Sequence, residues 1–389
     1  MGSAGAVLAA LQLAFALTWV IYVIYLPALA VQAGLPKHVV PWVLLMDQVV
    51  FIACDWSAGV YADRVAARLE RIGPRIALVT LASGGAFLLL PWLAPAGSPA
   101  LFVALTIAWS ATSSALRAPA LVLIGRHAAP PQRPWLAALY LLGLGIAGAL
   151  APYLGSALRN VDPRIPFALS TLAVVALTFA FAAAERRGTA PPGEATAQRG
   201  APAPSAARAA AFAAAIALFA FGFQVHFSVN SVPGYLRFAP PAQLEHLMPV
   251  FWVGFNLMML PATLLAKRHG GVPVMAAAGC AGVVFAMGAG LASSLEALLA
   301  MQFALGGAWG VVLMSGFTAA LEIGRPGREG SVTGMLFSML AVAAFARIAV
   351  VVAQLPKAAP IAPALAAIPS LAWGMASLLV LILAWKRSV

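Results

Sequence analysis

The sequence predicts an all-α integral membrane protein in which twelve transmembrane helices form two six-helix halves. Three observations lead to this fold class. The 389-residue chain is 63% hydrophobic and 9% charged, whereas soluble domains are about half apolar and a quarter charged. Apolar runs of about 20 residues, long enough to cross a bilayer, recur from end to end. Short stretches of the first half of the chain also match stretches of the second half.

The apolar runs set the expected helices. The first run has no basic segment before it and is longer than the apolar core of a signal peptide, so we interpret it as a retained first helix. The predicted helices cover about residues 6–32, 41–62, 76–93, 99–125, 135–158, 165–184, 209–231, 247–267, 272–292, 295–323, 331–354 and 364–386.

The positive charges indicate how the chain is oriented. The even-numbered loops and the C-terminus hold 16 lysines and arginines, and the odd-numbered loops hold 5. Basic loops stay in the cytoplasm, so we expect a multi-pass protein of a cell inner membrane with both termini cytoplasmic. Because these loops account for the net charge of +12, we expect the lipid bilayer as a partner and not nucleic acid.

One polar segment divides the chain. Residues 187–208 are dominated by Pro, Ala and Gly and cannot form a packed core, so we predict a cytoplasmic linker between six-helix halves at 1–186 and 209–389. The halves resemble repeats: FALTWVIYVIYLP at 15–27 aligns with FGFQVHFSVNSVP at 221–233. AGVYADRV at 58–65 aligns loosely with ATLLAKRH at 262–269, and LVLIGRHA at 121–128 aligns with AALEIGRP at 319–326. Matched six-helix repeats are typical of transporters.

A charged motif follows the second helix, in the stretch DWSAGVYADRVAARLERIGPR. Gly59, Asp63 and Arg64 resemble the signature loop between helices 2 and 3 of the major facilitator superfamily. The second part of the motif departs, because extra residues precede Gly73, so we expect a longer turn. Gly59 permits close helix approach, and Asp63 can accept hydrogen bonds from exposed backbone N–H groups at the start of helix 3. We interpret the motif as a conformational latch; the alternative is that its arginines only set topology.

A second resemblance lies in the fifth helix, in GIAGALAPYLG. Gly145, Gly148, Pro152 and Gly155 are similar to a glycine pattern that the same family associates with antiporters, with Ala151 in place of one glycine. The resemblance implies the fold of that family, transport by alternating access, and a direction tilted toward export. It also implies that helices 2 and 11 meet across the two halves.

Four ionisable residues lie at membrane depth, where charge is costly and therefore suggests function. Counted from the helix ends, Asp55 and Arg117 lie about 12 Å from the cytoplasmic side, and Asp47 and Arg347 lie about 24 Å from it. We therefore predict two ion pairs. Asp55–Arg117 would titrate during coupling, because the resemblance implies a basic residue of helix 4 in the proton network. Asp47–Arg347 would bridge the halves. The alternative is that both pairs are structural.

The resemblance implies that helices 1, 4, 7 and 10 line a central cavity. These helices and helix 8 carry polar and aromatic side chains, a lining that suits an amphipathic organic solute. The histidine could carry a proton or simply bond to a neighbouring helix. The predicted cavity residues are Tyr22, Tyr25, Gln224, His226, Asn230, Asn256 and Gln302.

These observations predict a secondary active transporter of a small organic solute. We expect it to be a monomer without cofactor or metal, coupled to protons and working as an antiporter or exporter; sodium coupling through either aspartate stays open. Catalytic and nucleotide-binding motifs are absent from the sequence, so we expect no enzyme. The alternatives are a receptor or scaffold that kept the fold without transport, and an intramembrane enzyme such as a lipid transferase. The excess of positive charge at depth hints at an anionic solute.

Overall fold

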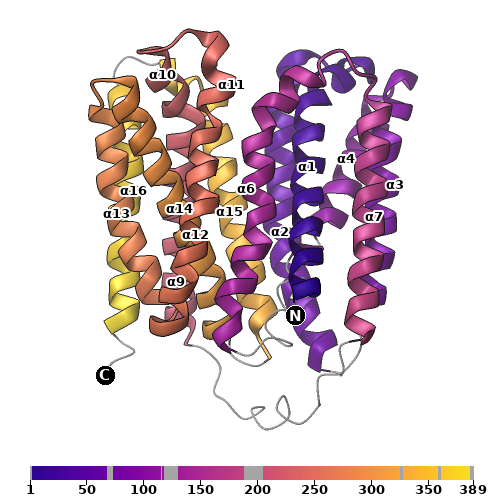
Figure 1. Cartoon of the computed structure of the whole chain (residues 1–389). Coiled ribbons are helices and arrows are strands. Elements are labelled where there is room, and N and C mark those ends of the chain that lie inside the picture. The colour runs from indigo at the N-terminus through magenta and orange to yellow at the C-terminus, as the bar shows by residue number, and fades with distance from the viewer. Residues whose placement is uncertain are drawn as a thin grey trace.

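The structure, a computed structural model, is a bundle of membrane-length helices (Figure 1). It describes residues 2–67, 73–114, 116–117, 130–187, 205–324, 327–357 and 361–385. Most of the predicted linker and the residues of the longer turn at 68–72 therefore lie outside the described residues. Within the described parts, eleven helices are long and apolar enough to cross a membrane, which agrees with the predicted fold class.

The twelfth predicted helix is α4, Pro99–Ser114, which is shorter in the described part of the chain. The remaining residues of that prediction lie mostly outside it. The first half of the bundle comprises α1 Gly2–Gln32, α2 Val40–Ala67, α3 Gly73–Leu93, α4, α6 Arg133–Ala157 and α7 Arg164–Arg187. The second half comprises α9 Ala206–Val225, α10 Ser231–Leu236, α11 Leu244–Leu247, α12 Pro249–His269, α13 Gly271–Leu291, α14 Leu295–Gly324, α15 Glu329–Val352 and α16 Ala362–Trp385.

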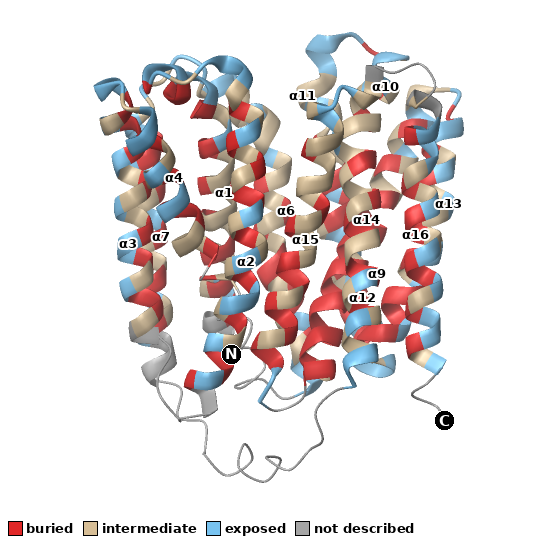
Figure 2. Cartoon of the chain, turned by 180° about the vertical axis from the view of Figure 1, so that it is seen from behind, coloured by how far each residue is buried: buried red, intermediate tan, exposed pale blue. Residues whose placement is uncertain are grey.

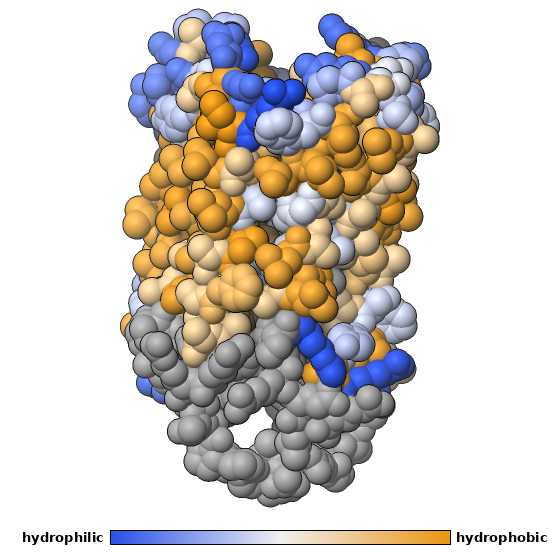
Figure 3. Space-filling view, turned by 90° about the vertical axis from the view of Figure 1, so that its right-hand side faces the viewer, coloured by the Kyte–Doolittle hydropathy of each residue, from blue (hydrophilic) through white to orange (hydrophobic). Residues whose placement is uncertain are grey.

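Helices dominate because backbone N–H and C=O groups have no water to bond to inside a bilayer. The outer surface fits this solvent: Figure 3 shows an apolar belt below a hydrophilic cap. Several leucines of the membrane-length helices are strongly exposed, among them Leu78, Leu264 and Leu291. Exposed leucines in such numbers are unfavourable in water but favourable in contact with lipid tails.

The two halves stand side by side, and α1 begins at the same end of the bundle at which α16 finishes (Figure 1). We call this the lower end and the opposite one the upper end. The main contacts between the halves are α2 with α15 and α6 with α12. The first of these confirms the expected meeting of helices 2 and 11.

The contact between α2 and α15 is built on small residues. A Cβ at Gly59 would overlap the carbonyl of Gly330, and a Cβ at Gly334 would lie 2.5 Å from the Asp55 carbonyl oxygen. Farther up, the Ser338 hydroxyl donates to the Ile52 carbonyl at 2.8 Å. The backbones of the two halves therefore approach as closely as glycines allow.

The interior of the second half is aromatic. Trp373 of α16 fills the space that Gly222 and Gly282 leave open, and its indole N–H donates to the Phe219 carbonyl at 2.9 Å. Figure 2 shows the buried residues concentrated on the inner sides of the helices. The main core of the second half continues into the first half, where Leu8 of α1 and Tyr140 and Leu141 of α6 join it.

Candidate functional site

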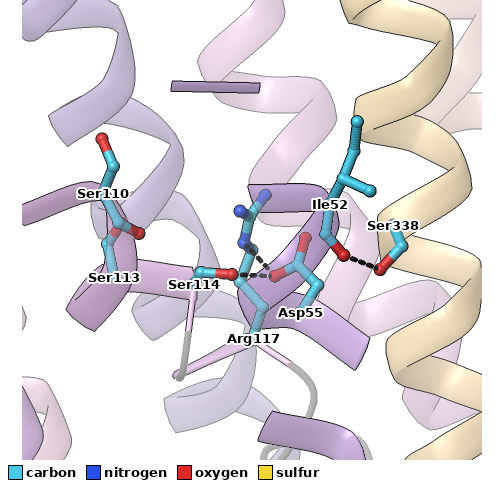
Figure 4. A network of polar contacts seen from close by, with 7 residues as sticks. All are labelled: Ile52, Asp55, Ser110, Ser113, Ser114, Arg117 and Ser338. Carbon is cyan, nitrogen blue, oxygen red and sulfur yellow. Dashed lines mark hydrogen bonds and ion pairs between the residues drawn. The ribbon is translucent and has the colours of Figure 1, made fainter. Parts of the chain in front are cut away.

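Asp55 and Arg117 form the predicted ion pair inside the first half. Arg117 Nε lies 3.3 Å from Asp55 Oδ1; the carboxylate is fully buried and the arginine side chain is 26% exposed. The Ser114 hydroxyl, one turn before Arg117, donates to the same oxygen (Figure 4). Asp55 Oδ2 and one terminal nitrogen of Arg117 are buried without a hydrogen-bond partner. The pair thus keeps one acceptor and one donor for another group.

Aromatic rings from both halves surround Arg117. Its guanidinium carbon lies 4.3 Å from the ring centre of Phe51 on α2 and 5.9 Å from that of Phe337 on α15. Phe337 packs against Phe317 of α14 at 5.2 Å, and Phe317 against Tyr140 of α6 at 6.0 Å. We call Tyr140, Phe317 and Phe337 the aromatic layer. It joins the two halves about 10–12 Å above the lower ends of their helices.

Asp47 does not pair with Arg347, so that prediction is wrong for this structure. Asp47 is fully buried, and its two oxygens accept from partners of its own half. The Tyr22 hydroxyl donates to Oδ2 at 2.8 Å and the Ser110 hydroxyl donates to Oδ1 at 2.7 Å. These short, local bonds satisfy the carboxylate without any contact across the halves.

Arg347 lies in the upper part of α15 and is half-buried. Its Nε is buried without a hydrogen-bond partner. Among the described residues no acid lies within 4.0 Å of its guanidinium. The neighbouring positions on α15 are mostly half-buried, whereas the lower part of the same helix is mostly buried. The residues of α15 are therefore more exposed in the upper part of the helix, where the ribbons of the two halves also stand farther apart (Figure 2).

The motif after α2 connects the two halves. Asp63 accepts from the backbone N–H of Gly330 and of Ser331, each at 2.7 Å, and from the Ser331 hydroxyl. These donors belong to the first turn of α15, whose exposed N–H groups favour an anion. The predicted donors near the start of helix 3 fall largely on residues outside the described part of the chain. Arg64 is exposed. The lower end is thus held closed by Asp63 and by the close contact at Gly59.

The glycine pattern of the fifth helix faces the second half. There is no room for a Cβ at Gly145, which meets Asn256, or at Gly148, which meets the Trp252 ring. Gly155 has open space around it, and Pro152 is half-buried. Two of the four pattern residues therefore form a flat contact surface for α12, and the other two do not share this role.

The predicted cavity residues divide into two groups. Tyr22 bonds to Asp47, and Tyr25 donates to the carbonyls of Leu158 and Val161 at 2.9 and 3.0 Å. Both tyrosines are buried within the first half, so neither faces open space in this conformation. In this structure the predicted cavity residues of helix 1 therefore do not line a common cavity with those of helix 7.

The second group lies in the second half. His226 Nε2 and Gln302 Oε1 are 2.9 Å apart, the Gln302 amide donates to Ser231 Oγ at 3.2 Å, and Ser231 donates to the His226 carbonyl at 2.9 Å. The Asn230 amide donates to the Leu365 carbonyl. Gln224 and Asn256 are half-buried, and Asn256 Oδ1 is buried without a partner. His226 thus bonds to a neighbouring helix, as the alternative interpretation proposed.

Sequence reasoning missed the serines of α4. Ser110, Ser114 and Arg117 recur at a spacing that places them on one helix face, and the two serines bond to Asp47 and Asp55 respectively. That spacing was the available signal. The aromatic layer had no comparable signal, because its members come from three separate helices.

The segment from His226 to Asn230 adopts a π-helical conformation between α9 and α10. Such segments are rare and often lie at functional sites. Among the described residues, no group of three or more His, Cys, Asp or Glu side chains could hold a metal ion.

The family model described as Major Facilitator Superfamily matches residues 8–347. A search of curated protein sequences gives no match. Among solved structures, the outward conformation of FucP, an E. coli fucose:proton symporter, is 14% identical with a TM-score of 0.69, covering 97% of this chain and 98% of that one.

Two further structures are similar. An outward-facing bacterial homologue of the iron transporter ferroportin, soaked with iron, is 14% identical with a TM-score of 0.74, covering 97% of this chain and 98% of that one. The proton:xylose symporter XylE is 12% identical with a TM-score of 0.64, covering 99% and 95%. At such low identity these likenesses show the fold.

Proposed function

Because the chain belongs to the major facilitator superfamily, a family of transporters and not of enzymes, we propose that it moves a small organic solute across the inner membrane, driven by protons. The moving parts are the halves 1–186 and 209–389, joined by the linker 187–208. Both termini face the cytoplasm, so the lower end is the cytoplasmic one. The protein works as a monomer, because each half covers the inner face of the other.

The observation that carries the proposal is the Asp55–Arg117 pair. A fully buried carboxylate 3.3 Å from a guanidinium can exist in two states: ionised and paired, or protonated with the arginine released. Its free Oδ2 is the atom that would take the proton. A group of this kind can exchange protons with the side of the membrane to which the bundle is open.

The closed lower end and the wider upper end support alternating access. In this conformation Asp63 and Gly59 hold α2 against α15, and the aromatic layer lies above them. Opening the lower end must break both contacts. We propose that protonation of Asp55 and solute binding together decide which end is open.

The direction of solute transport is proposed from the glycine pattern of the fifth helix. Gly145 and Gly148 give α12 a flat surface along which the halves can rock. Since the sequence pattern resembles that of antiporters, we propose export of solute against inward proton movement. The sign of the proton signal distinguishes this from symport.

The test is a pH measurement inside proteoliposomes that hold the purified full chain, while candidate organic anions and cations are added outside. We expect a solute-dependent pH change in the wild type and none in Asp55→Asn. Asp162→Asn, which removes a carboxylate from an exposed cap, is the matched control and should behave as wild type. Proton coupling would be overturned if solute flux caused no pH change and instead followed a sodium gradient. Absence of flux across the panel would favour the receptor or scaffold alternative.

A further inference from the structure

Arg347 carries a charge that no acid in the described part of the chain neutralises. Its Nε is buried without a hydrogen-bond partner, and no ion pair joins it to any described acid. The two aspartates at membrane depth are both engaged elsewhere: Asp47 with Tyr22 and Ser110, and Asp55 with Ser114 and Arg117.

Arg347 lies about 27 Å above the start of α15. The other acids whose side chains the structure describes lie at or next to the ends of helices, and none lies within 4.0 Å of the Arg347 guanidinium. These acids are Asp63, Asp162, Glu245, Glu296, Glu322 and Glu329.

An uncompensated guanidinium at this depth is costly and is retained where it serves a pathway or ligand. A planar guanidinium binds carboxylate or phosphate through paired, charge-assisted hydrogen bonds. The only part of α15 that is mostly half-buried is the upper part, which includes Arg347. An anion entering from the upper end would therefore meet this residue.

The neighbouring helix carries aromatic residues at the same level, whose rings pack against α12 and α14. α9 packs against α15, and its continuation, the π-helical segment His226–Asn230, lies about 30 Å above the start of α9. Phe223 and Phe227 are half-buried there and stack at 5.9 Å. Rings of this kind can pack against the body of an organic molecule.

We propose that Arg347 binds the anionic group of the transported solute, and that this solute is a small organic anion with an apolar body. The inference rests on the proposed transport function and adds the substrate class. It also gives a reason for the absence of the Asp47–Arg347 pair: Asp47 is satisfied within its own half, which leaves the arginine available to the solute.

The test compares acids with their neutral amides. The thermal unfolding temperature of the purified full chain is measured with benzoate or octanoate and with benzamide or octanamide. We expect at least one acid to raise the unfolding temperature of the wild type and its amide to have no effect. Arg347→Gln should raise the half-saturating concentration of the acid about tenfold or more, as expected for loss of a charged hydrogen bond. Arg159→Gln, at an exposed upper-end position, should change nothing.

Two results would overturn the proposal: stabilisation by the acids that survives in Arg347→Gln, or no stabilisation of the wild type by either acid. A measurement without ligand adds a second check. If Arg347 is unpaired, Arg347→Gln alone should leave the unfolding temperature unchanged or raise it, whereas a clear decrease would reveal a structural pair. Asp55→Asn should keep the acid-dependent shift, so a failure of proton coupling is distinguishable from a failure of anion binding.

Discussion

Single residues of α2 and α4 form a ladder of polar contacts. Asp47 meets Ser110 and Asp55 meets Ser114, so each acid on α2 has a hydroxyl partner on α4 at its own level. The two rungs differ in their third member: a tyrosine hydroxyl completes the upper one and an arginine the lower one. On the basis of this difference we propose a fixed role for Asp47 and a titrating role for Asp55.

A first prediction concerns the upper rung. Tyr22→Phe removes one donor to the buried Asp47 carboxylate and should destabilise the protein by about 1–3 kcal/mol, because the oxygen is left unsatisfied. Tyr25→Phe is the control, since its hydroxyl donates to backbone carbonyls, and its cost should be about 0.5–1.5 kcal/mol. Thermal unfolding in detergent measures both. Equal effects of the two substitutions would contradict a special role for the Asp47 contact.

At the scale of helices, the decisive contact is that of α2 with α15. A second prediction follows from its geometry: Gly59→Ala places a methyl group against the Gly330 carbonyl. The extra methyl group should cost about 1–3 kcal/mol in packing. This cost should disfavour the conformation with the closed lower end and reduce transport about tenfold. Gly85→Ala, where a Cβ meets nothing within 4 Å, should transport normally. The measurement is solute flux in proteoliposomes. Flux in Gly59→Ala equal to that of the wild type would contradict this role of the α2–α15 contact.

Asp63 gives a third prediction, again at the level of helix contact. Asp63→Asn loses the negative charge at the first turn of α15 and at least one of its hydrogen bonds. We expect the lower ends of α2 and α15 to separate. Spin labels at the exposed positions Arg64 and Arg328 should report a longer distance than in the unsubstituted pair. An unchanged distance distribution would show that the latch is held by the glycines alone.

The contact of α6 with α12 supplies a fourth prediction. Gly148→Ala drives a methyl group into the Trp252 ring and should slow solute flux, because the halves rock across this surface. Gly155→Ala has free space and should be neutral. Comparing their flux separates packing at the interface from a general intolerance of alanine in the fifth helix.

At the scale of the whole molecule, the sequence was sufficient for the architecture. The apolar spans and the glycine-rich contacts follow from rules that hold along a single helix, and the predicted helix bounds agree closely with α13, α14 and α15. The Asp55–Arg117 pair was also predictable, because depth in the membrane restricts an ionised residue to partners at the same level.

Predictions that needed the arrangement of helices around one another were less successful. Depth made Asp47 and Arg347 suitable partners, yet depth alone could not reveal that Tyr22 and Ser110 reach the carboxylate first. Tyr25 was similarly assigned to a cavity, although it packs inward against the loop at Leu158 and Val161. Rotation of a helix about its axis is what decides these cases, and an apolar span surrounded by other helices leaves little periodicity from which to read it.

In the mechanism that we propose, the Asp63 and Gly59 contacts and the aromatic layer close the lower end, and the buried carboxylate of Asp55 takes a proton above them. The most direct test of this account compares two modes of transport in the same vesicles. Asp55→Asn should still exchange labelled for unlabelled solute across the membrane, because binding and rocking are intact, but should no longer accumulate solute when a pH gradient is imposed. Loss of both modes, or retention of both, would contradict the assignment of Asp55 as the group that couples protons to movement.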